Sequence, residues 1–202
     1  MHSPTLSRAA YVLAGGKSSR MGDNKAFIDF HGQTLLDRAL AVLRAACGKT
    51  TIVGDPAIFG EHGPVVPDLF PGCGPLGGIH AALAHSSFDL NILLAVDMPF
   101  VSAELLRFLL REAENDASSA LVTVPRTGRG LQPLCAVYRR GFAAVAELAL
   151  KAGNYKIDSA FEAIPIKVIT ERELATAGFS EKDFFNVNTP DDRRAADNLP
   201  RL

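Results

Sequence analysis

The residues with the clearest chemical potential lie between positions 11 and 25, in the run YVLAGGKSSRMGDNK. A short apolar segment leads to two adjacent glycines, after which the bases Lys17, Arg20 and Lys25 follow. Adjacent glycines let the backbone turn without a Cβ penalty and bring N–H groups close to an anion, while the bases add positive charge. The run therefore predicts a strand that opens into a phosphate-binding loop, with a glycine-rich turn that holds no ligand as the alternative.

Two well-known glycine loops do not fit this run. The P-loop pattern requires a glycine at the position of Tyr11, five residues before Gly16. The dinucleotide pattern requires alternating glycines, whereas Gly15 and Gly16 are adjacent and the next glycine is Gly22. A phosphate bound here would be held by a third kind of loop.

Two aspartates follow apolar segments elsewhere in the chain. Asp97 comes after the unbroken apolar run at 92–96, which is typical of a central strand covered on both faces. A carboxylate at that place needs a partner that offsets its desolvation, and a divalent cation carrying a triphosphate is suitable. Asp68 follows a shorter apolar segment at 64–67. Both positions suit binding residues of an α/β sheet, and for both an ordinary turn or cap is the alternative.

The elements that must position these residues alternate between strands and helices. Strands are expected at 11–14, 26–30, 50–53, 64–67, 92–96, 120–125, 164–170 and in the stretch that carries Asn186 and Asn188, and helices at 34–47, 75–83, 102–113, 140–152 and from 190. Thr34 and Ser102 are the expected N-caps, and Gly48 is an expected helix end. The alternation predicts a three-layer α/β/α, Rossmann-like fold with a mainly parallel central sheet, in one domain spanning 1–202.

Composition and charge exclude several classes of protein. With 21 basic and 22 acidic residues and a net charge of −1, the chain has no electrostatic reason to bind nucleic acid or an anionic membrane. The three cysteines, among them Cys73 in the loop after Asp68, form no Cys-x-x-Cys pair, which favours reduced thiols in a cytoplasmic protein. No signal peptide or membrane-length apolar stretch is recognisable, so a soluble protein is expected. The five histidines show no metal-binding spacing.

The run LAGGKSSRMGDNK at 13–25 resembles the nucleotide-binding signature of the nucleoside-triphosphate transferases that make activated sugars and cofactors, Leu-Ala-Gly-Gly-x-Ser-x-Arg-Met-Gly-x-x-Lys. Four further segments are similar to the molybdenum cofactor guanylyltransferase branch of that family: Asp68 with Gly74-Pro75-Leu76-Gly77-Gly78, Val96-Asp97-Met98-Pro99, Gln132-Pro133-Leu134 with Tyr138, and the stretch from Phe184 to Pro190. Together the five segments extend over most of the chain.

The resemblance implies an enzyme that transfers GMP from GTP to Mo-molybdopterin, forming the guanine dinucleotide cofactor and releasing pyrophosphate. It assigns binding to Leu13, Ala14, Gly15, Gly16, Lys25, Asp68, Gly74, Pro75, Leu76, Asp97, Asn186 and Asn188. The implied catalytic residues are Arg20, Lys25 and Asp97, with Asp97 as the ligand of Mg²⁺. The N-terminal part would bind GTP and Mg²⁺ and the C-terminal part molybdopterin, with transient contacts to proteins that deliver the cofactor or receive it.

The second substrate and the nucleotide base are less well defined. Arg126 and Arg129 lie in a glycine-containing loop that could close over an anionic substrate, or be an ordinary solvated loop. Where guanylyltransferases often carry an Asn after the second main strand, this chain has Gly54. The cytidylyltransferase of the same cofactor and a sugar-phosphate nucleotidyltransferase are therefore the alternative enzymes, and a nucleotide-binding regulator without turnover is the non-enzymatic alternative.

Overall fold

The computed structural model describes residues 8–15, 24–187 and 192. Its strands are β1 (Arg8–Leu13), β2 (Asp29–Phe30), β3 (Gln33–Thr34), β4 (Thr50–Val53), β5 (Val65–Val66), β6 (Leu90–Ala95), β7 (Val122–Thr127), β8 (Gly130–Leu131), β9 (Cys135–Arg139) and β10 (Ile166–Ile169). Its α-helices are α1 (Leu35–Cys47), α2 (Pro56–Phe59), α3 (Pro75–His85), α4 (Ala103–Glu114), α5 (Phe142–Lys151), α6 (Ile157–Phe161) and α7 (Glu171–Thr176). The 3-10 helices among the described residues are η1 (Lys25–Phe27), η2 (Gly60–His62) and η3 (Glu181–Phe184).

The main sheet has the strand order β10-β7-β9-β6-β1-β4-β5, and β8 pairs with β7. β1 lies parallel between β4 and β6, β5 is parallel to β4, and β10 is parallel to β7. β9 is antiparallel to both of its neighbours, β6 and β7. Among the described strands of this path, β9 alone runs against the others, so the prediction of a mainly parallel sheet is confirmed.

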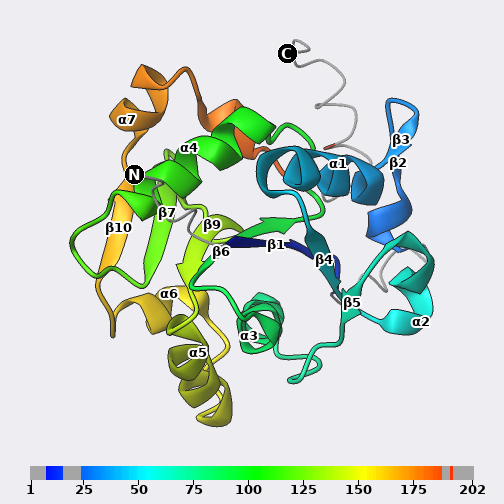
Figure 1. The fold of residues 1–202 in the computed structure, drawn as a ribbon, viewed down its shortest axis with the longest axis horizontal. Coiled ribbons are helices and arrows are strands. Elements are labelled where there is room, and N and C mark those ends of the chain that lie inside the picture. The colour runs from blue at the N-terminus through cyan, green and yellow to red at the C-terminus, as the bar shows by residue number, and fades with distance from the viewer. Residues whose placement is uncertain (1–7, 16–23, 188–191, 193–202) are drawn as a thin grey trace, which may run out of the picture.

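Side chains of the central strands alternate between two hydrophobic cores. Ala10 and Val12 of β1 pack in the core that contains α1 and α4, whereas Tyr11 and Leu13 pack in the core that contains α3, α5 and α6. Figure 1 shows α1 and α4 on one side of the sheet and α3, α5 and α6 on the other. The predicted three-layer α/β/α fold is confirmed.

The capping residues predicted for two helices are found at those positions in the structure. Thr34 Oγ1 accepts a hydrogen bond from the backbone N–H of Asp37 (3.0 Å), and Ser102 Oγ accepts one from Leu105 (3.1 Å). Gly48 ends α1 with φ of 84°, a conformation that favours glycine. None of the helices that the structure describes combines the length and apolar character needed to cross a membrane.

Three short segments differ from their predicted form. Residues 26–30 were expected as one strand, but the Asn24 side chain caps η1 and only β2 follows. The predicted flexible loop at 126–130 is a β-hairpin, in which Arg126 pairs with Leu131. The predicted strand before Asn188 is wrong for the described residues, because η3 occupies 181–184 and residues 185–187 belong to no strand. In the first two cases short-range contacts, the Asn24 cap and the pairing of β7 with β8, set the conformation.

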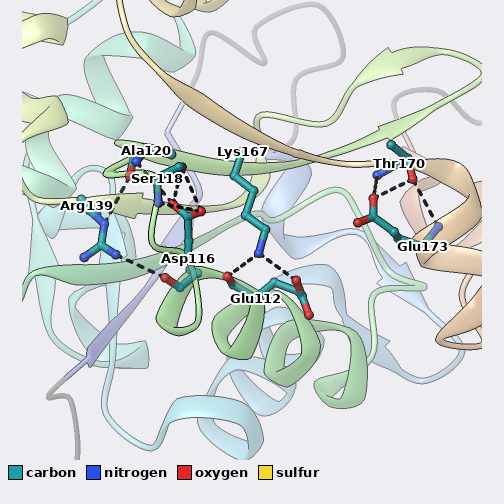
Figure 2. Close-up of polar contacts among 9 residues, drawn as sticks. Glu112, Asp116, Ser118, Ala120, Arg139, Lys167, Thr170 and Glu173 are labelled. Atoms are coloured by element: carbon teal, nitrogen blue, oxygen red, sulfur yellow. Dashed lines mark hydrogen bonds and ion pairs between the residues drawn. The ribbon is translucent and has the colours of Figure 1, made fainter.

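Side chains from the sheet close the C-terminal end of α4. Lys167 Nζ of β10 donates to the backbone carbonyl of Glu112 (2.7 Å) and to its carboxylate (2.8 Å), as Figure 2 shows. Arg139 of β9 donates to the backbone carbonyl of Ala113 (3.3 Å). Cations at this end of a helix satisfy carbonyls that have no partner within the helix and interact favourably with its dipole. These bonds fix β9 and β10 to α4.

Candidate active site

The carboxyl ends of β4, β1 and β6 meet at one edge of the sheet. Leu13 lies in register with Val53 of β4 and Ala95 of β6, so the residues that follow these strands are neighbours. The chain reaches β4 through α1 on one face, and it reaches β6 after α3 on the other face. The boundary between β1 and β6 is therefore the topological switch point, where open α/β sheets bind their ligands.

The turn after β1 is fixed by the backbone of β4. The N–H groups of Ala14 and Gly15 donate to the carbonyl of Val53 at 3.0 and 3.1 Å. A Cβ on Gly15 would lie 3.7 Å from the Cα of Gly54. These contacts hold Leu13, Ala14 and Gly15 at the switch point, where they were predicted to bind nucleotide. Gly16 and Arg20, predicted in the same loop, lie outside the described residues.

Lys25 and Asp97 meet at this edge. Lys25 Nζ lies 2.5 Å from Asp97 Oδ2, and each side chain is 19% exposed. The cap made by Asn24 starts η1 and so orients Lys25, while β6 delivers Asp97. The sequence predicted both residues in one site, and the structure brings them into contact across 72 positions of the chain. Their catalytic roles stay predictions.

The other oxygen of the Asp97 carboxylate, Oδ1, is buried and has no hydrogen-bond partner among the described residues. A buried carboxylate oxygen without a partner is unfavourable unless a ligand such as a cation occupies it. Carboxylate oxygens are also the ligands that hard divalent cations prefer, so this residue fits a divalent ion. The described residues contain no group of three or more His, Cys, Asp or Glu that could hold a metal.

The C-terminal segment contacts the turn that carries Asp97. The backbone N–H of Val187 donates to the carbonyl of Asp97 (2.8 Å), which places the exposed Asn186 beside this turn. Asn188, the second predicted asparagine, lies outside the described residues. Arg38 of α1 also contacts the turn, because its Nε donates to the carbonyl of Pro99. Arg38 was not among the predicted site residues, because no motif in the chain marks it.

Asp68 stands beside the first turn of α3. Its Oδ1 accepts a hydrogen bond from the N–H of Phe70 (2.8 Å), and a Cβ on Gly77 would lie 3.0 Å from the same oxygen. Asp68 therefore stabilises a turn, which was the alternative role predicted for it, and it remains a candidate for nucleotide binding. Leu76 is fully buried in the core and presents no surface to a ligand in this structure, whereas Gly74 and Pro75 are exposed.

The two arginines proposed for the second substrate occupy different environments. Arg129 Nε lies 3.1 Å from Glu181 Oε1, and its guanidinium lies 5.7 Å from the ring centroid of Phe185. Phe185 precedes Asn186, so Arg129 is connected to the segment that contacts Asp97. Arg126 is an exposed residue of β7, and among the described residues it makes no comparable contact with the site.

A mainly parallel three-layer fold with a glycine turn, a lysine and an aspartate at its switch point is the arrangement of a nucleotidyltransferase. Residues 10–164 match the MobA-like NTP transferase domain, and the chain belongs to this family. It is 37% identical to a probable molybdenum cofactor guanylyltransferase of Pelotomaculum thermopropionicum, covering 93% of this chain and 90% of that protein. It is 31% identical to the molybdenum cofactor guanylyltransferase of Desulfosudis oleivorans, covering 92% of each.

The fold agrees with a solved structure over almost its full length. The crystal structure of molybdopterin-guanine dinucleotide biosynthesis protein A from Archaeoglobus fulgidus is similar with a TM-score of 0.81 and 30% sequence identity. The similarity covers 93% of this chain and 96% of that chain.

Proposed function

We propose that the protein transfers GMP from GTP to Mo-molybdopterin, forming molybdopterin guanine dinucleotide and releasing pyrophosphate. The observation that carries the proposal is the contact between Lys25 and Asp97 at the switch point, with the second carboxylate oxygen of Asp97 buried and unpaired among the described residues. The names of the similar guanylyltransferases support the choice of substrates. The reaction belongs in the cytoplasm, in keeping with the free state of Cys47, Cys73 and Cys135.

Asp97 is the residue that would hold the divalent ion. Enzymes of this family generally use a divalent metal, and we propose Mg²⁺. When bound, Mg²⁺ would offset the negative charge of phosphate oxygens, which is the chemistry that phosphoryl transfer demands. Mg²⁺ is usually held by one or two carboxylates together with substrate phosphates, and the Asp97 carboxylate suits that mode.

The chain's own residues would position the nucleotide and neutralise its charge. The backbone from Leu13 to Gly16 and the Asp68 side chain would bind GTP, and Arg20 and Lys25 would neutralise the triphosphate. A phosphate oxygen of molybdopterin attacks the α-phosphorus, a new P–O bond forms, and the bond to pyrophosphate breaks. Because this phosphate is already ionised at neutral pH, the reaction requires in-line positioning and charge stabilisation rather than a protein nucleophile.

The C-terminal part would bind the second substrate. Asn186 lies beside the Asp97 turn, and Arg129 is linked to it through Phe185, so both are candidates to contact molybdopterin. Asn188 and Arg126 complete the predicted set. Transient contacts with proteins that supply molybdopterin or receive the product belong to the same proposal.

The test is pyrophosphate release in the presence of Mo-molybdopterin and Mg²⁺, with GTP, CTP and ATP in parallel reactions. Release with GTP alone is expected. A preference for CTP would make the protein a cytidylyltransferase, and release with none of the three would contradict the proposal.

A pair of variants tests the role assigned to Asp97. Asp97→Asn removes the charge at the carboxyl end of β6 and should abolish Mg²⁺-dependent turnover. Asp89→Asn is the matched control, because Asp89 precedes the same strand and forms an ion pair with Arg139 (2.5 Å) at the opposite edge. Equal activity in the two variants would remove Asp97 from the mechanism.

A further inference from the structure

Arg38 joins the helical layer to the turn that follows Asp97. It lies near the start of α1 and is partly buried. Its Nε donates to the carbonyl of Pro99, and its guanidinium lies 5.7 Å from the ring centroid of Phe30. Phe30 packs edge-on against Phe100, the residue after Pro99, with ring centroids 5.6 Å apart. The arginine is thus held by the same aromatic pair that borders the turn.

The turn from Asp97 to Pro99 is held at several backbone atoms. Val187 donates to the carbonyl of Asp97, and the N–H of Val101 donates to the carbonyl of Met98 (3.3 Å). Arg38 holds the third carbonyl in succession, that of Pro99. The Asp97 side chain is attached to the backbone of this turn. Movement of the turn would therefore displace the carboxylate oxygen that would bind a cation. Metal ligands commonly depend on such outer contacts for their orientation.

We propose that Arg38 is a positioning residue that fixes the Asp97 carboxylate for the divalent ion; this inference rests on the proposed function. Arg38 acts through the turn and does not itself touch the reacting atoms. Its guanidinium is planar and rigid and stays charged, so it holds a backbone carbonyl in one direction. Burial lowers the pKa of Arg38, which agrees with a guanidinium set into the protein rather than extended into solvent.

The test measures how strongly Mg²⁺ changes the affinity for GTP. Calorimetric titration gives the Kd of GTP in Mg²⁺ and again in EDTA, and the ratio of the two reports the metal contribution without any turnover. Arg38→Met should reduce this ratio by roughly tenfold, because the turn loses a hydrogen bond from a charged donor and part of that effect acts on Asp97. Arg38→Lys keeps a donor and should lie closer to the wild-type ratio.

Arg107→Met is the matched control for lost helix contacts. Arg107 of α4 donates to the carbonyl of Ala45 in α1 (2.6 Å), so it also joins two elements of the same layer through a backbone carbonyl. This variant should keep the wild-type ratio. Thermal unfolding of each variant identifies any that fail to fold. If Arg38→Met does not fold, Arg38→Lys, which lacks the planar guanidinium, should still give a smaller ratio than Arg107→Met, and equal ratios in these two variants would overturn the positioning role.

The outcomes separate this inference from the proposed function. A normal ratio in Arg38→Met, or an equal loss of affinity with and without Mg²⁺, would overturn the positioning role. A wild-type protein whose GTP affinity does not respond to Mg²⁺ would overturn it as well. If the wild type shows the Mg²⁺ effect and Arg38→Met loses it, the positioning role is supported even where no transfer to molybdopterin occurs, and only the proposed acceptor then fails.

Discussion

Lys25 and Asp97 form an ion pair at the candidate active site. The ammonium group of Lys25 is therefore already placed where a triphosphate would bring negative charge. Lys25→Ala should lower kcat/KM by about 10²–10³, the usual effect of removing one group that stabilises a developing charge. Steady-state kinetics with GTP and Mo-molybdopterin would measure it.

Lys167→Ala is the control for Lys25→Ala. Lys167 is a lysine of similar exposure whose ion pair with Glu112 (2.8 Å) lies beside α4. The control should lose roughly 1 kcal/mol of stability through the helix end that it satisfies, while kcat/KM stays at the wild-type value. Equal kinetic effects in the two variants would mean that the loss is not specific to the site.

Gly54 is fixed by its neighbour Phe59. A Cβ at residue 54 would lie 2.7 Å from two ring carbons of Phe59, which is itself 1% exposed. Gly54→Ala should therefore lower the free energy of unfolding by about 1–3 kcal/mol, the usual effect of overpacking. In the double variant with Phe59→Leu, part of that loss should be recovered. Purely additive urea-unfolding energies would show that the two residues do not interact.

The sequence could identify Lys25 and Asp97 because each stands in a pattern with its own chemistry: a lysine that closes a glycine loop and an acid that ends an apolar strand. It could not identify Arg38. An arginine on a helix usually belongs to a solvated face, and its acceptor here is a backbone carbonyl 61 positions away. The close contact between Gly54 and Phe59 was equally hidden, because a glycine gives no sign of what occupies the space beside it.

At the scale of elements, the sequence predicts helix ends best, because they are determined by interactions between residues close together in the chain. Thr34, Gly48 and Ser102 marked helix ends because capping involves residues a few positions apart. The two-residue strands β2 and β8 gave no usable signal, since two residues are too few to show an alternating pattern, even though their partners β3 and β7 lie nearby in the chain. α7 was not predicted, although its start carries a recognisable signal: Thr170 and Glu173 form a capping box there.

α3 carries a buried histidine that makes the stability of the fold depend on pH. His80 is 6% exposed, packs edge-on against Phe70, and its Nδ1 has no hydrogen-bond partner among the described residues. Burial lowers the pKa of His80, and the carboxylates of Glu147 and Asp68 offset this only in part. The unfolded chain, with an ordinary histidine pKa of about 6.5, therefore binds more protons than the native state just below that pH.

The free energy of unfolding should accordingly fall as the pH drops below about 6.5 toward the native pKa of His80, and the contribution should be fully present above pH 6.5. His80→Leu should flatten this part of the curve, measured by urea unfolding between pH 7.5 and 5.5. His85→Gln, in the exposed last turn of the same helix, should retain the wild-type slope. An unchanged slope in His80→Leu would mean that other groups cause the acid sensitivity.

At the scale of the whole molecule, the two parts assigned to different substrates share one sheet. β9 from the C-terminal half lies between β6 and β7, and Val187 bonds to the turn after β6. Leu134 packs against both cores. Neither part has a core of its own, because each face of the sheet is completed by helices from both halves of the chain. The proposed single domain over 1–202 therefore predicts one cooperative unfolding transition.

The chain contains no tryptophan, which allows a clean test of that cooperativity. Tyr11 and Tyr138 report on the core with α3, while Phe179→Trp would introduce a probe beside Phe108, against the core with α4. In urea, tyrosine fluorescence of the wild type, tryptophan fluorescence of the variant and the circular dichroism of both should give coincident transitions, after correction for any change in overall stability. A tryptophan transition separated from the circular dichroism of the same variant would mean that the C-terminal part unfolds independently. In that case the second substrate would bind to a separable unit, and the contact between Val187 and Asp97 would be a junction between two domains.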